Sequence, residues 1–154
     1  GLKIVLEPGR VIVANAGILV ARVIYAKHGR DKTFTVVDAA MNDLIRPTLY
    51  EAEHEIWRVS ELAAGAAPVV QDVVGPVCET GDYLALNRAL PPFAAGDLLA
   101  FMTAGAYGAA MSSTYNSRLL VPEGLVKGAD WSVVRPRPTY ADLMGLDRLP
   151  EWLA

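Results

Sequence analysis

The sequence predicts a mostly β domain, a sandwich or barrel, preceded by the end of an α/β unit. Short runs rich in apolar and β-branched residues recur along the chain, and Gly, Pro, Asn or Asp punctuation separates them. The opening differs from this pattern, because a strand-like run is followed by Pro-Gly and then by a helix-like run. We therefore expect residues 1–16 to be the last piece of an α/β unit and residues 17–154 to form the β domain.

The opening segment predicts a strand, a turn and a helix. Residues 3–7 (KIVLE) are typical of a short buried strand that Pro8 and Gly9 end. An apolar strand must pair with a neighbour, and we expect that neighbour in a preceding part of the protein that this chain lacks. Residues 11–16 predict one short helix with Gly17 as its C-cap.

The β domain begins with a predicted hairpin. Residues 18–25 and 33–37 are strand-like runs on either side of the polar turn 28–31. A turn of helix, limited by Pro47, is expected within 43–50. The other predicted elements are a loop at 38–42, strands at 56–59 and 67–74 with Gly65 between them, further strands at 83–87, 98–103, 118–121 and 131–134, a turn at 90–92, a glycine-rich segment at 105–110 and a short helix with Thr139 as its N-cap.

Composition and charge narrow the class of protein. The 154 residues are 53% hydrophobic and 20% charged, with a mean hydropathy of +0.27, which suits a packed domain and not a disordered chain. The net charge is −3 and no Lys/Arg cluster occurs, so we expect no nucleic-acid partner. The longest apolar stretch, Val11 to Ala26, is too short and too interrupted to span a bilayer. A single cysteine cannot form an internal disulfide, which indicates a reducing, cytoplasmic setting.

The only cysteine lies in the segment GPVCETGD at 75–82. A lone cysteine is most often a small buried hydrophobe. Here a Gly-Pro ends the preceding strand and a Gly-Asp turn follows, so we expect Cys78 and Glu79 on a loop, where functional side chains concentrate. A thiol can act as a nucleophile or as a proton donor, and no histidine lies close in sequence to form a Cys–His pair.

Three further patterns suit ligand binding. The segment EPGR at 7–10 joins a strand end to a helix, where backbone amides bind phosphate well, although an ordinary Pro-Gly turn with a solvated Arg has the same sequence. Arg46 and Tyr50 are four residues apart and share one helical face, which suits a carboxylate or else describes a surface Arg beside a half-buried Tyr. Tyr107, inside GAYGAA, either faces a ligand or packs.

The two histidines are given no role. We expect His28 at the tip of the hairpin and His54 exposed at the start of a strand. They are far apart in the sequence and no pair of cysteines joins them, so no metal site is predicted.

Five segments, in their order and spacing, resemble the diaminopimelate decarboxylase family, whose members use pyridoxal 5′-phosphate to make L-lysine. The likeness covers essentially the whole chain and only the C-terminal part of such an enzyme. Ala40 and Thr80 depart from the family pattern, which commonly has glycine and serine there. The segments are LEPGR at 6–10, DAAMNDLIRPTLY at 38–50, GPVCETGD at 75–82, GAYGAAMSSTYNSR at 105–118 and RPRPTYADL at 135–143.

The resemblance implies a fold and partners. These enzymes have the fold-type III, alanine racemase-like architecture: an N-terminal (β/α)8 barrel that carries the cofactor lysine, and a C-terminal β-sandwich-like domain. Residues 1–16 would then be the last strand and phosphate-binding loop of the barrel, whose remainder is absent from this chain. The resemblance also implies a homodimer with active sites at the interface, acting on a small amino acid.

The resemblance assigns the cofactor contacts to two places in the chain. Glu7, Pro8, Gly9 and Arg10 would line the cofactor phosphate, at the end of a barrel strand where ligands of such barrels bind. Tyr107 would contact the cofactor from the glycine-rich segment. Arg10 and Tyr107 would also contact the substrate.

The resemblance assigns the remaining roles to two pairs of residues. Arg46 and Tyr50 would hold the substrate carboxylate that is not lost. Cys78 would donate a proton in the active site of the neighbouring subunit, where Glu79 would bind the substrate.

The implied function is pyridoxal-phosphate-dependent decarboxylation of meso-2,6-diaminopimelate to L-lysine and CO2, a lyase reaction of amino-acid biosynthesis. We expect the chain alone to be inactive, because none of its lysines (Lys3, Lys27, Lys32 and Lys127) lies in the context of the cofactor lysine. Two alternatives stay open. One is a segment of an ornithine- or arginine-type decarboxylase of the same fold, whose members tend to carry Asp after the cysteine and to lack the Arg-Pro-x-x-Tyr arrangement. The other is an isolated, non-catalytic interaction domain.

Overall fold

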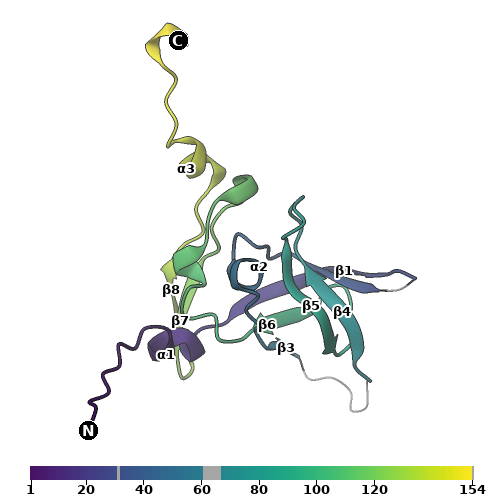
Figure 1. The fold of residues 1–154 in the computed structure, drawn as a ribbon. Coiled ribbons are helices and arrows are strands. Elements are labelled where there is room, and N and C mark those ends of the chain that lie inside the picture. Colours follow the sequence, from purple (N-terminus) through teal and green to yellow (C-terminus); the bar gives the residue numbers. More distant parts are fainter. Residues whose placement is uncertain (31, 61–66, 154) are drawn as a thin grey trace. The chain divides into compact units, whose positions relative to one another are not determined.

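The structure is a computed structural model that describes residues 1–30, 32–60 and 67–153 (Figure 1). The chain divides into two compact units, Gly1–Ser112 and Ser113–Ala154. The larger unit holds a six-stranded sheet and the smaller one a two-stranded sheet. No helix among the described residues is long and apolar enough to cross a bilayer.

The larger unit alternates short helical turns with strands. Its helices are α1 (Arg10–Val13) and α2 (Arg46–Tyr50), with 3-10 turns at Ala14–Ala16 and Ala109–Met111. Its strands are β1 (Leu19–His28), β2 (Thr33–Val37), β3 (Ile56–Arg58), β4 (Val69–Val74), β5 (Tyr83–Leu90) and β6 (Leu98–Phe101).

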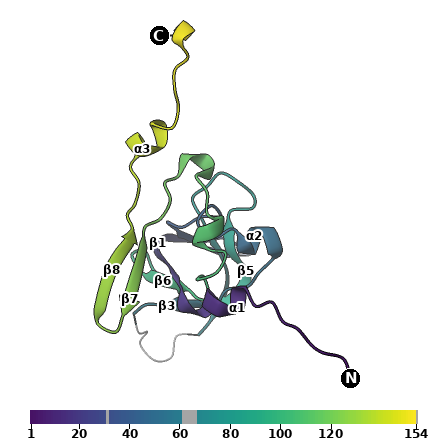
Figure 2. The same cartoon turned by 90° about the vertical axis from the view of Figure 1, so that its left-hand side faces the viewer.

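Strand β1 joins the two halves of the sheet, whose order is β3-β6-β1-β2-β4-β5. The first half of β1 pairs with β6, with Leu19 opposite Phe101, and the second half pairs with β2, with Val23 opposite Val37. A bulge between Val23 and Tyr25 interrupts the pairing with β2 just after this change of partner. Neighbouring strands are antiparallel except β2 and β4, which are parallel. The sheet curls, so β4 and β5 run across the direction of β1 and β6 (Figures 1 and 2).

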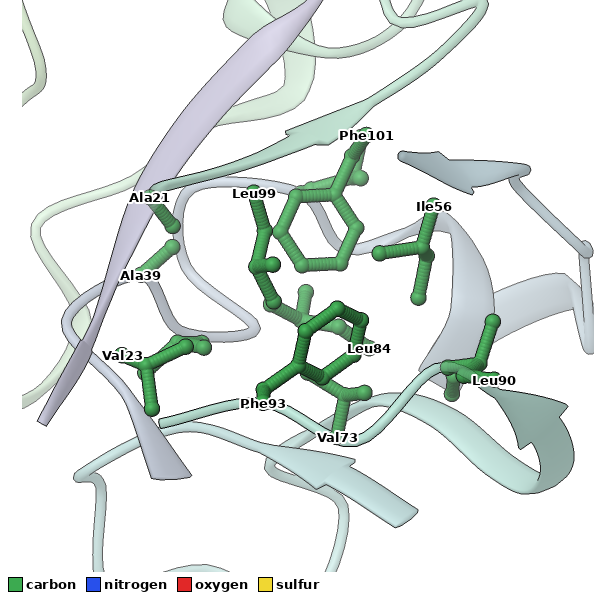
Figure 3. Close-up of a cluster of buried hydrophobic side chains, with 13 residues drawn as sticks. Ala21, Val23, Ala39, Ile56, Val73, Leu84, Leu90, Phe93, Leu99 and Phe101 are labelled. Atoms are coloured by element: carbon green, nitrogen blue, oxygen red, sulfur yellow. The ribbon is translucent and has the colours of Figure 1, made fainter. Parts of the chain in front are cut away.

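The core lies inside this curl. Burial alternates along β1 and β2, as the period of a half-buried strand requires, and Val37, Val73, Leu99 and Phe101 are fully buried. Figure 3 shows side chains of β1, β3 and β6 pointing toward those of β4 and β5. The cluster consists of Ala21, Val23, Val37, Ala39, Leu44, Ile56, Val73, Leu84, Ala85, Leu90, Phe93, Leu99 and Phe101.

Most elements predicted for the larger unit are confirmed. The strand 33–37 has the predicted bounds, and the predicted strands 18–25, 56–59, 67–74, 83–87 and 98–103 correspond to β1, β3, β4, β5 and β6 with ends shifted by a few residues. The predicted helix 11–16 is α1 followed by a 3-10 turn that Gly17 caps in an extended conformation. Asp31 of the predicted turn, and Gly65, lie outside the described residues.

The strand predicted at residues 3–7 is wrong for this chain. Residues 1–9 have no regular secondary structure, and side chains such as Ile4 (85% exposed) and Leu6 (81% exposed) are in solvent. A strand needs a partner for its backbone groups, and none of the described strands pairs with this segment. The apolar pattern is present, but the chain supplies no surface that would bury it.

The smaller unit contains the hairpin of β7 (Glu123–Lys127) and β8 (Asp130–Arg135), then α3 (Tyr140–Met144). The strand predicted at 118–121 is wrong, because the strand begins only after Pro122. The turn sets this register: Lys127 pairs with Asp130, and Gly128 has a φ of +61°, the conformation that favours glycine in a two-residue hairpin loop.

Two predictions for the smaller unit are confirmed. The predicted strand 131–134 lies within β8, and Thr139 is the N-cap of α3. Its hydroxyl accepts a hydrogen bond from the Asp142 amide, while the Asp142 carboxylate accepts one from the Thr139 amide. The Thr139 amide and the Thr139 hydroxyl both donate to the Asp142 carboxylate, and these two hydrogen bonds lower the pKa of Asp142.

Candidate functional site

The strongest candidate site centres on a buried arginine. Arg46 begins α2 and is only 9% exposed. Among the described residues it has no ion-pair partner. A buried charge without a counter-ion costs several kcal/mol, roughly, because water no longer solvates it. The arrangement therefore suits an anionic ligand that would complete the pair.

Two tyrosine rings flank this guanidinium. The Arg46 Cζ atom lies 6.0 Å from the centre of the Tyr50 ring and 5.8 Å from the centre of the Tyr107 ring, distances at the limit of a cation–π contact. Tyr50 is placed by helix geometry, since residues four apart share a face. The short helix that does so has Pro47 in its first turn, where proline is tolerated, and ends at Glu51 in a left-handed conformation.

Tyr107 reaches the cluster through the loop that follows β6. Its φ is +59°, which is unfavourable for a bulky residue and typical of functional positions. The loop crosses the 3-10 turn closely, with hydrogen bonds from the Ala104 amide to the Gly17 carbonyl (2.8 Å) and from the Gly105 amide to the Ala14 carbonyl (3.0 Å). A Cβ at Gly105 would stand 2.1 Å from a backbone oxygen of α1. Only glycine therefore fits here.

The same loop contact brings the EPGR segment to the cluster. A Cβ placed on Gly9 would lie 3.5 Å from the Tyr107 hydroxyl, so the phenol end of Tyr107 stands over the start of α1. Arg10 is the first residue of that helix. Glu7 and Pro8 are exposed in the irregular segment before it. The fold thus joins Gly9 and Tyr107 to the pair Arg46 and Tyr50, which the sequence analysis had singled out as three separate patterns.

A buried histidine completes the surroundings of Arg46. We expected His54 to be exposed, and this is wrong: its side chain is 4% exposed, and its Nδ1–H donates to the Met102 carbonyl at 2.8 Å. Burial is the main cause that lowers its pKa, and the nearby charges of Arg46 and Arg10 lower the pKa further, against the Met102 hydrogen bond. Strand alternation could have revealed this, because His54 stands two residues before the buried Ile56 and so shares its face.

The other histidine lies where the sequence predicted. His28 ends β1 at the exposed tip of the hairpin, where its Nδ1 is 3.3 Å from the Thr33 hydroxyl. Among the described residues no three His, Cys, Asp or Glu side chains gather in a way that would hold a metal ion.

The loop at 75–82 follows β4, as predicted, and presents Cys78 as an exposed free thiol. Glu79 beside it is also exposed. One buried carboxylate organises the loop: Asp82, 4% exposed, accepts hydrogen bonds from the Met41 amide (2.7 Å) and the Val77 amide (2.6 Å). The sequence analysis treated Asp82 only as a turn residue and missed this role.

The loop is also attached to α2. The Thr48 hydroxyl donates to the Gly81 carbonyl at 2.5 Å, so the element that carries Arg46 holds one end of the Cys78 loop. The loop and the Arg46 cluster are therefore mechanically linked, although Cys78 itself faces solvent.

A pocket of about 320 Å³ lies between α2 and β5, and its lining includes Glu51, Glu53 and Arg88. None of the residues singled out from the sequence lines it. Its arginine already has an acidic neighbour, with Arg88 Nη1 3.5 Å from a Glu53 carboxylate oxygen. The uncompensated charge of Arg46 makes the cluster, and not this pocket, the candidate site.

Comparison with known proteins gives concordant matches. A family model described as "Pyridoxal-dependent decarboxylase, C-terminal sheet domain" matches residues 11–105. The diaminopimelate decarboxylase of Pseudomonas aeruginosa is 53% identical over 151 residues, which are 97% of this chain and 36% of that protein. The diaminopimelate decarboxylase of Zymomonas mobilis is 49% identical over 151 residues, which are 98% of this chain and 35% of that protein.

A solved structure agrees with these relatives. The diaminopimelate decarboxylase of M. jannaschii, in co-complex with L-lysine, has a TM-score of 0.88 at 36% identity and covers 96% of this chain and 33% of its own. The predicted fold class and the resemblance are therefore confirmed. The chain spans about a third of the length of the curated relatives it matches.

Proposed function

The chain belongs to the pyridoxal-dependent decarboxylases, as their C-terminal sheet domain, and we propose that it is the C-terminal part of a diaminopimelate decarboxylase. The whole enzyme would convert meso-2,6-diaminopimelate to L-lysine and CO2. The observation that carries this proposal is the buried Arg46 guanidinium, which has no ion-pair partner among the described residues and lies within about 6 Å of the centres of two tyrosine rings.

The charge of Arg46 supports a substrate with a second carboxylate. Arginine binds carboxylates through two parallel hydrogen bonds, and a bound carboxylate would remove the cost of the buried, unpaired cation. Diaminopimelate keeps one carboxylate when CO2 leaves, so the substrate could remain anchored at Arg46 and Tyr50 during the reaction. Ornithine and arginine have only the carboxylate that is lost, and this favours diaminopimelate over those alternatives.

The residues at the start of α1 fit pyridoxal phosphate. Gly9 lets a phosphate approach the backbone, Arg10 supplies a positive charge, and the Tyr107 hydroxyl stands 3.5 Å from the place of a Gly9 Cβ. In this proposal Glu7, Pro8, Gly9 and Arg10 line the phosphate. When bound, the cofactor supplies the electron sink for the pair of electrons that CO2 leaves behind.

The lysine that anchors the cofactor would come from a separate barrel part. We assign residues 1–16 to the end of that (β/α)8 barrel and residues 17–154 to the sheet domain. The share of the relatives' length that this chain covers supports a missing barrel, and so do the exposed apolar side chains of Ile4 and Leu6. A reducing, cytoplasmic setting remains a prediction, supported by the single cysteine.

Cys78 and Glu79 would act in the neighbouring subunit of a homodimer. Both side chains are exposed on their loop, and this supports the role. Residues that complete a site on another chain must be exposed on the surface of their own chain. The Cys78 Sγ–H would donate the proton that replaces CO2, and the Glu79 carboxylate would bind an ammonium group of the substrate.

Substitution of Arg46 tests the proposal in the enzyme that contains both parts. Arg46→Ala should lower kcat/KM for diaminopimelate by roughly 2–4 kcal/mol of transition-state binding, or about 30- to 1,000-fold. The matched control is Arg22→Ala, an exposed arginine of β1, which should change kcat/KM by less than about threefold. An unchanged kcat/KM in Arg46→Ala, or faster turnover of ornithine or arginine than of diaminopimelate, would refute the assignment.

The activity of the isolated chain is tested separately, because the chain spans only about a third of the length of its relatives. We expect no decarboxylation by the purified 154-residue chain with added pyridoxal phosphate. Denaturing mass spectrometry after borohydride reduction distinguishes an isolated chain from a chain bound to the barrel part. Detection of a second polypeptide with a cofactor-modified lysine would mean that the 154-residue chain is one part of a working enzyme. Turnover by the chain alone would overturn the assignment of the lysine to the barrel.

A further inference from the structure

Two buried polar atoms next to the proposed carboxylate site lack partners. Within the described residues, neither Nε2 of His54 nor Nε of Arg46 has a hydrogen-bond partner. Both side chains are at least nine-tenths buried, at 4% and 9% exposure. A buried polar atom loses its hydrogen bonds to water and is destabilising without a replacement, so each of the two needs a partner when the site is in use.

The two atoms are chemically complementary. A carbonyl oxygen can only accept, so the Met102 contact places the proton of the neutral imidazole on Nδ1. Nε2 then carries a lone pair and is an acceptor. Nε of an arginine is always a donor. The acceptor of His54 and the donor of Arg46 can therefore form a hydrogen bond with each other.

The orientation of the imidazole is fixed from the backbone. Met102, which accepts the Nδ1–H, donates its own amide to the Glu55 carbonyl at 2.8 Å, next to the pairing of Ile56 with Phe101. The segment that carries His54 is thus held against the end of β6, from which the Tyr107 loop departs. A ring fixed in this way can orient a flexible neighbour.

Burial, and after it the charges around His54, keep the imidazole neutral. Arg46 of α2 and Arg10 of α1 act on it as like charges, and Arg88 of β5 donates to its backbone carbonyl at 3.3 Å. The acid among these neighbours, Glu53, is 3.5 Å from Arg88 and so compensates that cation. A protonated His54 would add a further buried positive charge to this group, which burial and repulsion both oppose.

We propose that His54 is a positioning residue for Arg46: Nε2 of His54 accepts the Nε–H of Arg46 and turns the guanidinium so that Nη1 and Nη2 face the substrate carboxylate. The two atoms are not hydrogen-bonded to each other in this structure, and the bond forms by rotation of the arginine side chain when a carboxylate engages its far edge. This inference rests on the proposed function, because it concerns how that carboxylate is held.

The test uses two substitutions of His54, each of which preserves one of the two hydrogen-bonding groups of the imidazole. In His54→Asn the amide N–H takes the place of Nδ1–H and keeps the Met102 bond, but no acceptor reaches the position of Nε2. In His54→Gln the amide oxygen takes the place of Nε2 and keeps the acceptor. The probes are L-lysine and 1,5-diaminopentane, which differ only by the carboxylate that Arg46 would hold, and the readout is their equilibrium affinity for the enzyme containing both parts.

We expect the wild type to bind L-lysine more tightly than 1,5-diaminopentane. His54→Asn should lose about ten- to a hundredfold of this preference, whereas His54→Gln should stay within about threefold of the wild type. In turnover, His54→Asn should raise KM for diaminopimelate more than it changes kcat. Nitrogen NMR of the wild type gives a measure free of folding defects: the Nε2 resonance of His54 should move to that of a hydrogen-bonded acceptor with L-lysine and not with 1,5-diaminopentane.

Equal preference in both variants and the wild type, a larger loss in His54→Gln than in His54→Asn, or an unmoved Nε2 resonance would each overturn the positioning role. Failure of the proposed function has a different signature. In that case the wild type would not prefer L-lysine over 1,5-diaminopentane, or Arg46→Ala would leave its preference intact.

Discussion

Arg46 and Cys78 stand in regions that differ in how far this chain alone completes them. Arg46 is buried, with two tyrosine rings and a histidine around it from three separate segments. Cys78 is exposed on a loop, and its thiol has no hydrogen-bond partner among the described residues. The first region is a cluster of side chains that this chain assembles from its own segments. The second region is an exposed loop, and a site around its thiol would have to be completed by another protein surface.

The largest effect is expected when the Arg46 and the Cys78 substitutions are carried by different subunits of one dimer. Neither Arg46→Ala nor Cys78→Ala enzyme should show appreciable activity. If Cys78 serves the neighbouring subunit, equal mixing of the two inactive proteins should restore about a quarter of wild-type activity, because about half of the dimers are mixed and each mixed dimer has one intact site. The measurement is decarboxylase activity after subunit exchange.

The matched control is a mixture in which every proposed site lacks the Cys78 thiol. Cys78→Ala mixed with Cys78→Ala/Arg46→Ala should remain inactive, since neither chain then supplies a thiol. Absence of recovery in the first mixture, with exchange verified, would place Cys78 in the site of its own chain and remove the contrast between the regions.

A large effect on the loop should come from its buried carboxylate. Asp82→Ala leaves the amides of Met41 and Val77 without their acceptor, and should lower the free energy of unfolding by about 3 kcal/mol. Urea-induced unfolding of the chain measures this. Asp82→Asn keeps one oxygen acceptor and should lose about half as much. A loss below about 1 kcal/mol in Asp82→Ala would show that the loop does not depend on this carboxylate.

A smaller loss of stability is expected from the hydrogen bond that joins α2 to the Cys78 loop. Thr48→Val preserves shape and removes the hydroxyl that donates to the Gly81 carbonyl, so unfolding free energy should fall by about 1 kcal/mol. In the whole enzyme this variant should affect proton donation by Cys78 more than binding of L-lysine. The comparison of kcat with the affinity for L-lysine tests this, and an equal effect on both would mean that the two regions move as one.

The smallest effect is the pH dependence of the buried region. The pKa of His54 is lowered from 6.5 in the folded chain, so the unfolded chain binds more protons as the pH falls below 6.5, and stability should decrease there. His54→Gln should flatten this part of the curve of unfolding free energy against pH. Parallel curves for His54→Gln and the wild type would show that His54 does not titrate differently on folding.

Local patterns predicted the parts of the site that depend on neighbours in sequence. Arg46 and Tyr50 could be paired because a helical face places them together, and the Cys78 loop because turn residues bracket it. The approach of Tyr107 to Gly9 and Arg46 depends on the pairing of β1 with β6, which no local spacing encodes. The strand expected at 3–7 failed for the same reason, since a strand exists only with a partner.

The missed residues are polar groups whose burial depends on tertiary structure. His54 and Asp82 lie next to turns or strand ends, where exposure is the ordinary expectation. Alternation with Ile56 would have indicated an inward side chain for His54, but the prediction of an exposed His54 did not use it. For Asp82 no local pattern distinguishes a carboxylate that caps backbone amides of a distant segment from one in a solvated turn.

Strand β1 has partners at very different distances along the chain, and this bears on how the protein is made. β2 follows β1 directly, whereas β6 begins only at Leu98, and closing a longer loop costs more entropy and time. During synthesis the β1–β2 hairpin can therefore form while β6 is still inside the ribosome. Met102 and Tyr107 emerge later still. A nascent chain halted before Met102 would already contain Arg46, but it would lack the ring of Tyr107 and the Met102 carbonyl that holds His54.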